Sequence, residues 1–218
     1  MRRLPAIVLV AALVPLACGP AAKPRPQPAS PKAEAPAVLK DGEWGRFRSQ
    51  RQGLSIPLPE GKTWRIDDHS DRWLDARHPG TGTRLRARTW IEPKPVNRDQ
   101  CEAEARRLAP DLPVIDEHGA IDDHVSSDLF APDFSSHVIV GVNDANPTSG
   151  ALEGYVLVFG AAARRCVVLS FTTQVNGPKG SAVLGERLEL GTRIAENTIY
   201  VTRMPDGPFE PIATPAPR

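Results

Sequence analysis

Two apolar runs joined by a short link make up residues Leu152 to Gln174, which read L-E-G-Y-V-L-V-F-G-A-A-A-R-R-C-V-V-L-S-F-T-T-Q. The first run ends at Phe159, and the second begins at Arg165. Nearly continuous apolar runs of this length are typical of strands that are buried on both faces of a sheet. Because the link is short and contains Gly160, we expect the two strands to pair antiparallel.

Further strands are predicted on the N-terminal side of this pair. Ser136–Val142 is a third apolar run, and the turn-rich link Asn143–Gly150 joins it to the pair. Residues 83–91 instead alternate in polarity with a period of two, which is typical of a strand with one solvated face. The arginines of this strand are Arg84, Arg86 and Arg88, and they alternate with Leu85, Ala87 and Thr89.

Shorter strands are predicted earlier in the chain and in the acidic connection before the apolar runs. In residues 53–59, the side chains of Leu54, Ile56 and Leu58 share one face, and the prolines confine the strand to a sheet edge or a strand end. The predicted ranges are Gly45–Arg51, Gly53–Pro59, Trp64–Ile66, Trp73–Arg77 and, within Asp111–Phe134, Val125–Phe130.

Two main helices are predicted. The first is Arg98–Leu108, which begins after the N-cap residue Asn97 and has Gln100 in capping-box position. The second is Ala182–Thr198, where Gly191 costs about 1 kcal/mol relative to alanine. The order of these elements predicts the fold class α+β, a mostly antiparallel β-sheet covered by two main helices.

The early stretch Gly53–Pro59, followed by Trp64, resembles the corresponding part of the PsbP-like α/β/α sandwich. In that family an early hairpin ends in a proline, with a tryptophan shortly after. The resemblance covers about Phe47 to Val201 and implies a binding and assembly fold without a shared catalytic site, so it assigns no functional residue here. A lipocalin-like barrel and a cystatin-like sheet are the alternative folds.

The N-terminus has the organisation of a secretory signal. Arg2 and Arg3 precede the apolar run Leu4–Leu16, which is too short for a transmembrane helix of roughly 20 residues. The run ends in Ala17-Cys18, which resembles the lipobox of bacterial lipoproteins, with Pro15 at the position where that motif usually has leucine. The resemblance implies cleavage before Cys18 and acylation of its thiol; a plain signal peptide and an uncleaved anchor are the alternatives.

The lipobox implies attachment to the cell envelope, and Gly19 after the anchor cysteine favours the outer membrane over the inner membrane by analogy with lipoprotein sorting. Residues 1–17 are the predicted signal peptide and residues 18–40 a lipid-anchored, proline-rich tether. Residues 41–203 are the predicted globular domain, large enough to bury a core, and residues 204–218 a disordered proline-rich tail.

Charge and cysteine content narrow the possible functions. The formal net charge is +1, and removal of Arg2 and Arg3 with the leader leaves 25 basic against 26 acidic residues, so we expect no nucleic-acid partner. With Cys18 acylated, Cys101 and Cys166 remain as an even pair. In an oxidising compartment they are expected to form a disulfide; two buried thiols are the alternative.

Candidate enzymatic sites are weak. Three triplets place acids beside a histidine, but neighbouring residues on an extended chain point to opposite sides, so several triplets would have to converge to bind a metal. They are Asp67-Asp68-His69, Asp116-Glu117-His118 and Asp122-Asp123-His124. Four serines lie near His124 and His137 in sequence, without a nucleophile-elbow motif: Ser126, Ser127, Ser135 and Ser136. We therefore expect no catalytic residue, no metal and no cofactor.

The candidate binding surface is the stripe of Arg84, Arg86 and Arg88, which suits anionic lipid headgroups, lipid-linked sugars or an acidic partner. Its alternative is the solvated face of an edge strand, where charge opposes aggregation. The four tryptophans are expected to pack in the core or the hairpins, with a ligand-stacking surface as the alternative: Trp44, Trp64, Trp73 and Trp90.

Together these features predict a lipid-anchored cell-envelope lipoprotein that acts as a non-enzymatic binding or assembly module. Its expected partners are the membrane, through the anchor, and an envelope protein. The alternatives are an envelope hydrolase, with or without metal assistance, and a purely structural coat protein. The hydrolase requires His69, His118 or His124 to converge with carboxylates in a pocket.

Overall fold

A computed structural model of the chain describes residues 38–114, 119–146, 150–176, 180–201 and 209–215. The chain divides into the units Met1–Lys32 and Ala33–Arg218, and all the described residues lie in the second unit. The predicted signal peptide, Cys18 and most of the tether therefore lie outside the described residues, as does the triplet that contains His118.

The larger sheet has seven strands among the described residues, in the order β3-β4-β5-β9-β8-β7-β6, and all neighbours are antiparallel. β8 and β9 pair from Leu152 opposite Val175 to Ala162 opposite Arg165, as the two apolar runs predict. The bounds are Arg65–Asp67 for β3, Leu74–His78 for β4, Thr83–Ile91 for β5, Ala120–Ser126 for β6, Ser135–Asn146 for β7, Ala151–Ala162 for β8 and Arg165–Val175 for β9.

The smaller sheet has four strands in the described residues, in the order β10-β2-β1-β11, and the 3-10 helix Gly61–Thr63 follows β2. β10 pairs with Leu54 and Ser55, so in the described ranges Pro57 and Pro59 have a strand neighbour on the β1 side alone. This is the position that the missing N–H groups of proline favour. The bounds are Trp44–Ser49 for β1, Leu54–Pro59 for β2, Ile199–Tyr200 for β10 and Phe209–Ile212 for β11.

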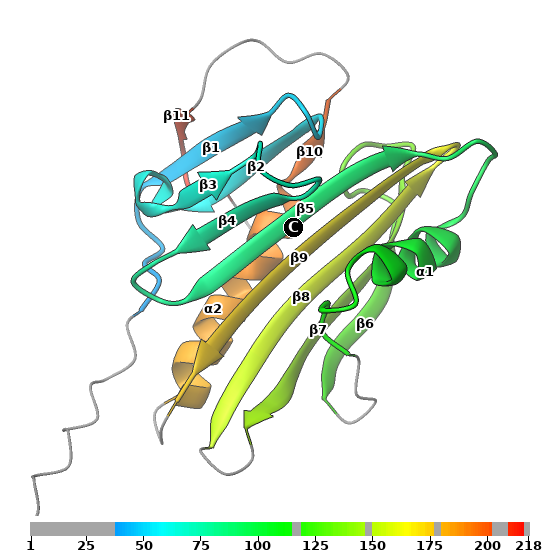
Figure 1. The fold of residues 1–218 in the computed structure, drawn as a ribbon. Helices are drawn as coiled ribbons and strands as arrows, with labels where there is room; N and C mark the ends of the chain where they lie inside the picture. The colour runs from blue at the N-terminus through cyan, green and yellow to red at the C-terminus, as the bar shows by residue number, and fades with distance from the viewer. Residues whose placement is uncertain (1–37, 115–118, 147–149, 177–179, 202–208, 216–218) are drawn as a thin grey trace, which may run out of the picture. The chain divides into compact units, whose positions relative to one another are not determined.

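The two helices lie on opposite faces of the larger sheet (Figure 1). α1, Arg98–Leu108, crosses β8 and β9 on one face, and α2, Gly180–Glu196, packs against the same two strands from the other. α2 also contacts β2 of the smaller sheet. The fold class is therefore confirmed as α+β, with mostly antiparallel sheets and two main helices.

Burial of both faces explains why the central strands read as continuous apolar runs. On β8, Val156 and Val158 belong to the core shared with α2 and the smaller sheet. Tyr155, Leu157 and Phe159, which alternate with them, belong to the core under α1. All five side chains are fully buried, so neither face of this strand needs polar residues.

α2 approaches β9 closely at Gly191, the glycine that lowers the helix propensity of this segment. A Cβ atom at this position would lie 2.6 Å from the ring of Phe171 on β9. The contact requires a glycine, so its helix-propensity cost is offset by the close packing it allows. A second helical glycine, Gly185, has open space around the same position.

The start and the end of the described domain meet at Arg193 of α2. Its guanidinium donates to Asp41 Oδ2 at 2.6 Å and to the backbone oxygen of Pro215 at 2.7 Å, and it lies 5.2 Å from the ring of Trp44. The hydrogen bond from Arg193 lowers the pKa of Asp41. Leu39 is also buried, so the packed region begins slightly before the predicted boundary at Asp41.

Three expectations are wrong in detail. The predicted strand Val125–Phe130 is instead β6, Ala120–Ser126, an outer strand whose exposed residues carry little apolar periodicity. The predicted disordered tail at residues 204–218 contains β11, which pairs with β1 and places Pro211 opposite Gly45 on a sheet edge that tolerates proline. The arginine-rich strand is not an edge strand along Arg84 and Arg86, because β4 pairs with β5 from Thr83 to Ala87 and β9 pairs with its other side.

Candidate functional site

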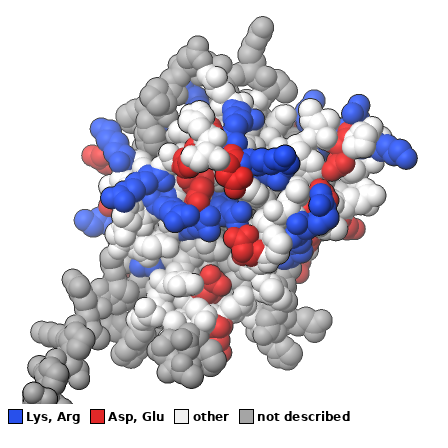
Figure 2. Space-filling view, in the orientation of Figure 1, with Lys and Arg blue, Asp and Glu red and all other residues white. Residues whose placement is uncertain are grey.

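The arginine stripe of β5 lies on the α1 side of the larger sheet. Arg88 is opposite Val168, which packs in the core under α1, and alternate residues of a strand share a face. α1 contacts β7, β8 and β9, and no helix of the described residues lies over the half of this face that β4 and β5 form (Figure 1). In the same orientation, Figure 2 shows lysine and arginine side chains gathered across this half, with acidic side chains among them.

Arg84 is held in an ion pair within the sheet. Its Nη2 lies 2.7 Å from Asp75 Oδ2 on β4, and Arg77 donates to the same oxygen at 2.9 Å. Burial alone raises the pKa of Asp75, but the two guanidinium groups outweigh it and hold the pKa at about 2. Most of the binding capacity of Arg84 is therefore used inside the molecule.

Arg86 has a similar internal role. Its Nη1 donates to Asp111 Oδ2 at 2.8 Å, and its guanidinium carbon lies 4.5 Å from the ring centroid of Trp73. The side chain is only 11% exposed. The hydrogen bond from Arg86 lowers the pKa of Asp111, which lies just after α1, so this arginine ties the end of α1 to β5.

Arg88 differs from its two neighbours in the stripe. Its guanidinium carbon lies 5.8 Å from the ring of Trp73 and 5.9 Å from the ring of Trp90, both within cation–π range. Among the described residues, no carboxylate lies within 4.0 Å of it. Burial lowers the pKa of Arg88 from its usual value, and the nearby charge of Arg72 adds to this effect. We call Trp73, Arg86, Arg88 and Trp90 the Trp–Arg face.

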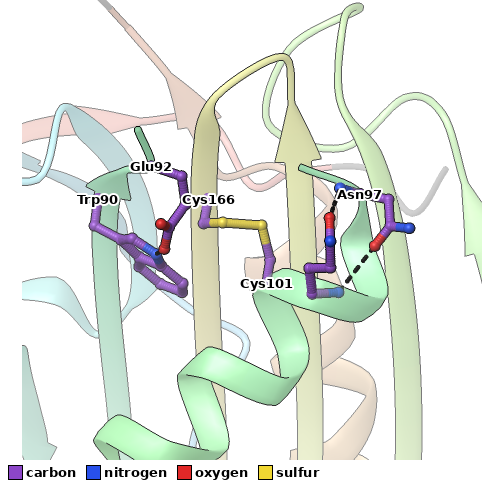
Figure 3. The surroundings of a disulfide bond; sticks show 6 residues. Trp90, Glu92, Asn97, Cys101 and Cys166 are labelled. Atoms are coloured by element: carbon purple, nitrogen blue, oxygen red, sulfur yellow. Dashed lines mark hydrogen bonds between the residues drawn. A yellow bond between two sulfur atoms is a disulfide. The ribbon is translucent and has the colours of Figure 1, made fainter. Parts of the chain in front are cut away.

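The disulfide packs against Trp90 of the Trp–Arg face. Cys101 in α1 and Cys166 in β9 form the expected pair, with a Cα–Cα distance of 5.5 Å (Figure 3). Trp90 packs against this pair and donates from Nε1 to Glu92 Oε1 at 2.7 Å, which fixes the plane of its indole. The start of α1, the disulfide and Trp90 thus form one rigid support.

The start of α1 is fixed by the predicted capping box (Figure 3). The side chain of Asn97 accepts a hydrogen bond from the backbone N–H of Gln100 at 2.9 Å, and the side chain of Gln100 accepts one from the backbone N–H of Asn97 at 3.0 Å. Because the helix begins at a defined residue, Cys101 lies one turn later, directly over β9.

The acid–histidine triplets do not converge in the described part of the chain, which contains no group of three residues suited to a metal ion. Asp67 instead accepts hydrogen bonds from the backbone N–H groups of His69 and Ser70, an ordinary polar turn. His124 contacts Asp122 at 3.0 Å on the exposed strand β6.

His137 does not form a serine–histidine pair. Its Nδ1 lies 2.8 Å from Glu102 Oε2 on α1, and its Nε2 lies 2.8 Å from Asp123 Oδ1 on β6. Both nitrogens are therefore occupied by carboxylates. This arrangement connects α1 with two strands, and the serines near His137 in sequence play no part in it.

Two features of this region carried no signal in the sequence. A cavity of about 470 Å³ lies between the two sheets, at the end of β5 that continues past β4. Arg165 lines this cavity, and its guanidinium carbon lies 5.6 Å from the ring of Tyr200 on β10. Arg165 and Tyr200 are 35 residues apart in sequence, so only the tertiary fold brings them together.

No known family model matches the chain, and no curated protein sequence is similar to it. A crystal structure from Bacteroides thetaiotaomicron VPI-5482 is 12% identical, with a TM-score of 0.38, and covers 66% of this chain. This chain spans 46% of that structure's length. A mutant of the protein Mog1 is 9% identical, with a TM-score of 0.43, and the match covers 72% of this chain and 95% of that one.

Among the described residues, no helix has both the length and the apolar character that crossing a bilayer requires.

Proposed function

We propose that the protein is a lipid-anchored lipoprotein of the cell envelope whose domain is a non-enzymatic module that binds an anionic partner. The observation that carries this proposal is the state of Arg88. It is a cation between the rings of Trp73 and Trp90, and the nearby carboxylates of Asp71 and Glu104 act on it from beyond the 4.0 Å of an ion pair. A guanidinium held in place by two aromatic rings suits a carboxylate or phosphate group, since the arginine and the two tryptophans do not have to reorganise on binding.

The support under the Trp–Arg face fits a binding role. The disulfide, the capped start of α1 and the ion pair from Arg86 to Asp111 hold the surface in one conformation. Binding to such a surface costs little conformational entropy. The partner we propose is an envelope protein with an acidic surface.

The signal-like leader and the lipobox-like end at Cys18 support the proposed location. Acyl chains add about 0.8 kcal/mol of membrane affinity per buried CH₂, so several chains on one cysteine give firm anchoring. The proline-rich residues 19–37 would then act as an extended spacer of about 3.1 Å per residue. The residue after the cysteine, Gly19, favours the outer membrane.

Site-specific photocrosslinking in intact cells tests the binding role. The crosslinking amino acid replaces Arg107, whose side chain is 69% exposed and whose charge acts on Arg88. The control position is Val114, which is 75% exposed. We expect an adduct from position 107 that is lost in Arg88→Gln and kept in Arg77→Gln. An adduct that survives Arg88→Gln, or no adduct at position 107, contradicts the proposal.

Mass spectrometry of the mature N-terminus tests the anchor. We expect a chain that begins at an acylated Cys18, and release of the Cys18→Ser variant from the membrane fraction. An uncleaved leader or an unmodified Cys18 thiol contradicts the lipid anchor without affecting the binding proposal.

A further inference from the structure

β5 is longer than its neighbour β4, and the difference leaves a gap in the sheet. β4 begins at Leu74, opposite Ala87, so among the described residues Arg88–Ile91 have a strand partner only on the β9 side. The part of the larger sheet that the structure describes therefore has no strand beside the last four residues of β5, which also carry two members of the Trp–Arg face.

A side chain replaces one hydrogen-bonded step of this missing strand. The backbone N–H of Thr89 donates to Gln52 Oε1 at 2.8 Å. The same carboxamide donates from Nε2 to the backbone oxygen of Arg72 at 3.0 Å. Gln52 is 4% exposed and lies in the turn between β1 and β2. Its amide thus acts as the peptide group of an added strand.

The next step along the strand is open. Backbone orientation repeats at every second residue of a strand, so the N–H and C=O of Ile91 point the same way as those of Thr89. In the ranges that the structure describes, no hydrogen bond reaches Ile91 from that side. The Ile91 side chain is 70% exposed. An open strand edge of this kind is a template for an extended segment of another chain.

The cavity between the two sheets lies beside this open edge. Its volume of about 470 Å³ is within the usual range of ligand sites, about 300–1,000 Å³. The residues that matter here are Gly53, Ile91, Arg165 and Tyr200. Arg165 is opposite Ile91 across the β5–β9 pair, so its side chain is on the same face of the sheet as the cavity.

Arg165 is a cation with spare hydrogen-bonding capacity. Its guanidinium lies on the ring of Tyr200, and the nearest described carboxylate, that of Asp133, is 3.9 Å away, beyond hydrogen-bond distance. Arg88 on β5 and Arg165 on β9, which is opposite Ile91, point to opposite faces of the sheet. Successive side chains of a strand also point to opposite faces. Two neighbouring acidic residues of an added strand can therefore meet one arginine each.

We propose that the anionic partner binds as an extended peptide that adds a strand beside Trp90 and Ile91, beyond the position that Gln52 occupies, and directs adjacent acidic side chains to Arg88 and Arg165. The inference rests on the proposed function and deepens it by naming the form of the partner. Gln52 fixes where the added strand begins, because it already occupies the position beside Thr89. The peptide backbone supplies part of the affinity, and the two arginines supply the preference for acids.

A defined peptide tests this mode of binding. The probe is a fluorescein-labelled peptide of sequence Thr-Val-Glu-Glu-Val-Thr, added to the mature full chain in detergent micelles and followed by fluorescence anisotropy. The matched control is Thr-Val-Gln-Gln-Val-Thr. We expect the Kd to rise about tenfold for the control peptide, for Arg165→Gln and for Arg88→Gln, and to stay unchanged for Arg77→Gln. Hydrogen exchange of the Ile91 amide should slow when the acidic peptide binds.

The outcomes separate this inference from the proposal on which it rests. Equal binding of the two peptides, no binding at all, or no change in Ile91 exchange overturns strand addition. If the crosslinked adduct at position 107 still depends on Arg88, the binding function stands and only the strand-addition mode fails. If neither the adduct nor the anisotropy depends on Arg88, both proposals fail.

Discussion

His137 Nδ1 lies 2.8 Å from Glu102 Oε2, which ties β7 to α1, and Asp123 holds the second ring nitrogen from β6. Burial alone lowers the pKa of His137, but the two carboxylates outweigh burial and raise the pKa above its usual value of 6.5. The neighbouring Arg106 also pairs with Glu102, at 2.9 Å. The charged imidazole therefore joins three elements at once.

The stability of the fold should depend on pH through His137. A pKa that is higher in the folded than in the unfolded state stabilises the fold below the unfolded pKa, and this contribution is lost as pH rises through the folded pKa. We expect His137→Gln to lower the free energy of unfolding by about 1 kcal/mol more at acidic than at alkaline pH, measured by urea unfolding at both. The control substitution is His124→Gln on exposed β6, and it should change the free energy of unfolding little at either pH. Equal losses for His137→Gln at the two pH values would contradict a stabilising role of the charged imidazole between Glu102 and Asp123.

Gly185 and Gly191 of α2 should respond to alanine in opposite directions. Gly191→Ala places a Cβ 2.6 Å from the Phe171 ring and forces α2 away from β9, so we expect a loss of about 1–3 kcal/mol. Gly185→Ala meets no atom within 4 Å and should gain up to about 1 kcal/mol from helix propensity. Thermal unfolding of both variants measures these changes. A Gly191→Ala variant as stable as the natural chain would show that the packing of α2 on Phe171 can accommodate a methyl group.

Gln52 should be important for stability although it is a polar residue in a turn. Its amide satisfies the backbone N–H of Thr89 and the backbone oxygen of Arg72 in part-buried hydrogen bonds, so Gln52→Ala leaves both backbone groups without this partner. We expect a loss of about 1–3 kcal/mol in urea unfolding. The matched control is Gln174→Ala, an exposed glutamine whose amide only meets Glu153 at 3.4 Å, and it should change little. A similar effect of the two substitutions would argue against the bridging role.

The disulfide should contribute much of the stability of the domain. It closes a loop with a sequence separation of 65, for which chain entropy gives about 4 kcal/mol. We expect Cys101→Ser, Cys166→Ser and the double variant to lose similar amounts, and reductant to have the same effect on the natural chain but none on the variants. Urea midpoints with and without reductant measure this. A double variant much less stable than either single one would indicate a role beyond the bond itself.

Sequence patterns predict best where local chemistry and tertiary packing agree. The capping box of Asn97 and Gln100 fixes the start of α1, and the structure has Arg98–Leu108 at the predicted bounds. The alternation of residue types predicts the strand Thr83–Ile91. One side of β5 packs in the core, and the other side faces solvent and contributes residues to the Trp–Arg face. The pairing of Cys101 with Cys166 follows from their being the even pair left in the domain.

The patterns fail where long-range contacts decide the structure. β6 has no apolar periodicity because it is an outer strand, and Phe130, which was expected to end it, has a φ of 66° and bridges Ile199 instead. β11 lies in a proline-rich tail and exists only because β1 offers an edge. The roles of Arg84 and Arg86 depend on Asp75 and Asp111, and no sequence spacing reveals these partners.

The contacts of Arg193 determine how the domain would carry a mechanical load. If the segment ahead of Val38 is the tether we propose, tension along it reaches the ion pair with Asp41 and buried Leu39 before it reaches β1. The force is then borne by α2, which packs in the core, before it reaches the hydrogen bonds of β1, which can break one after another. The smaller sheet would therefore stay paired under moderate tension on the tether.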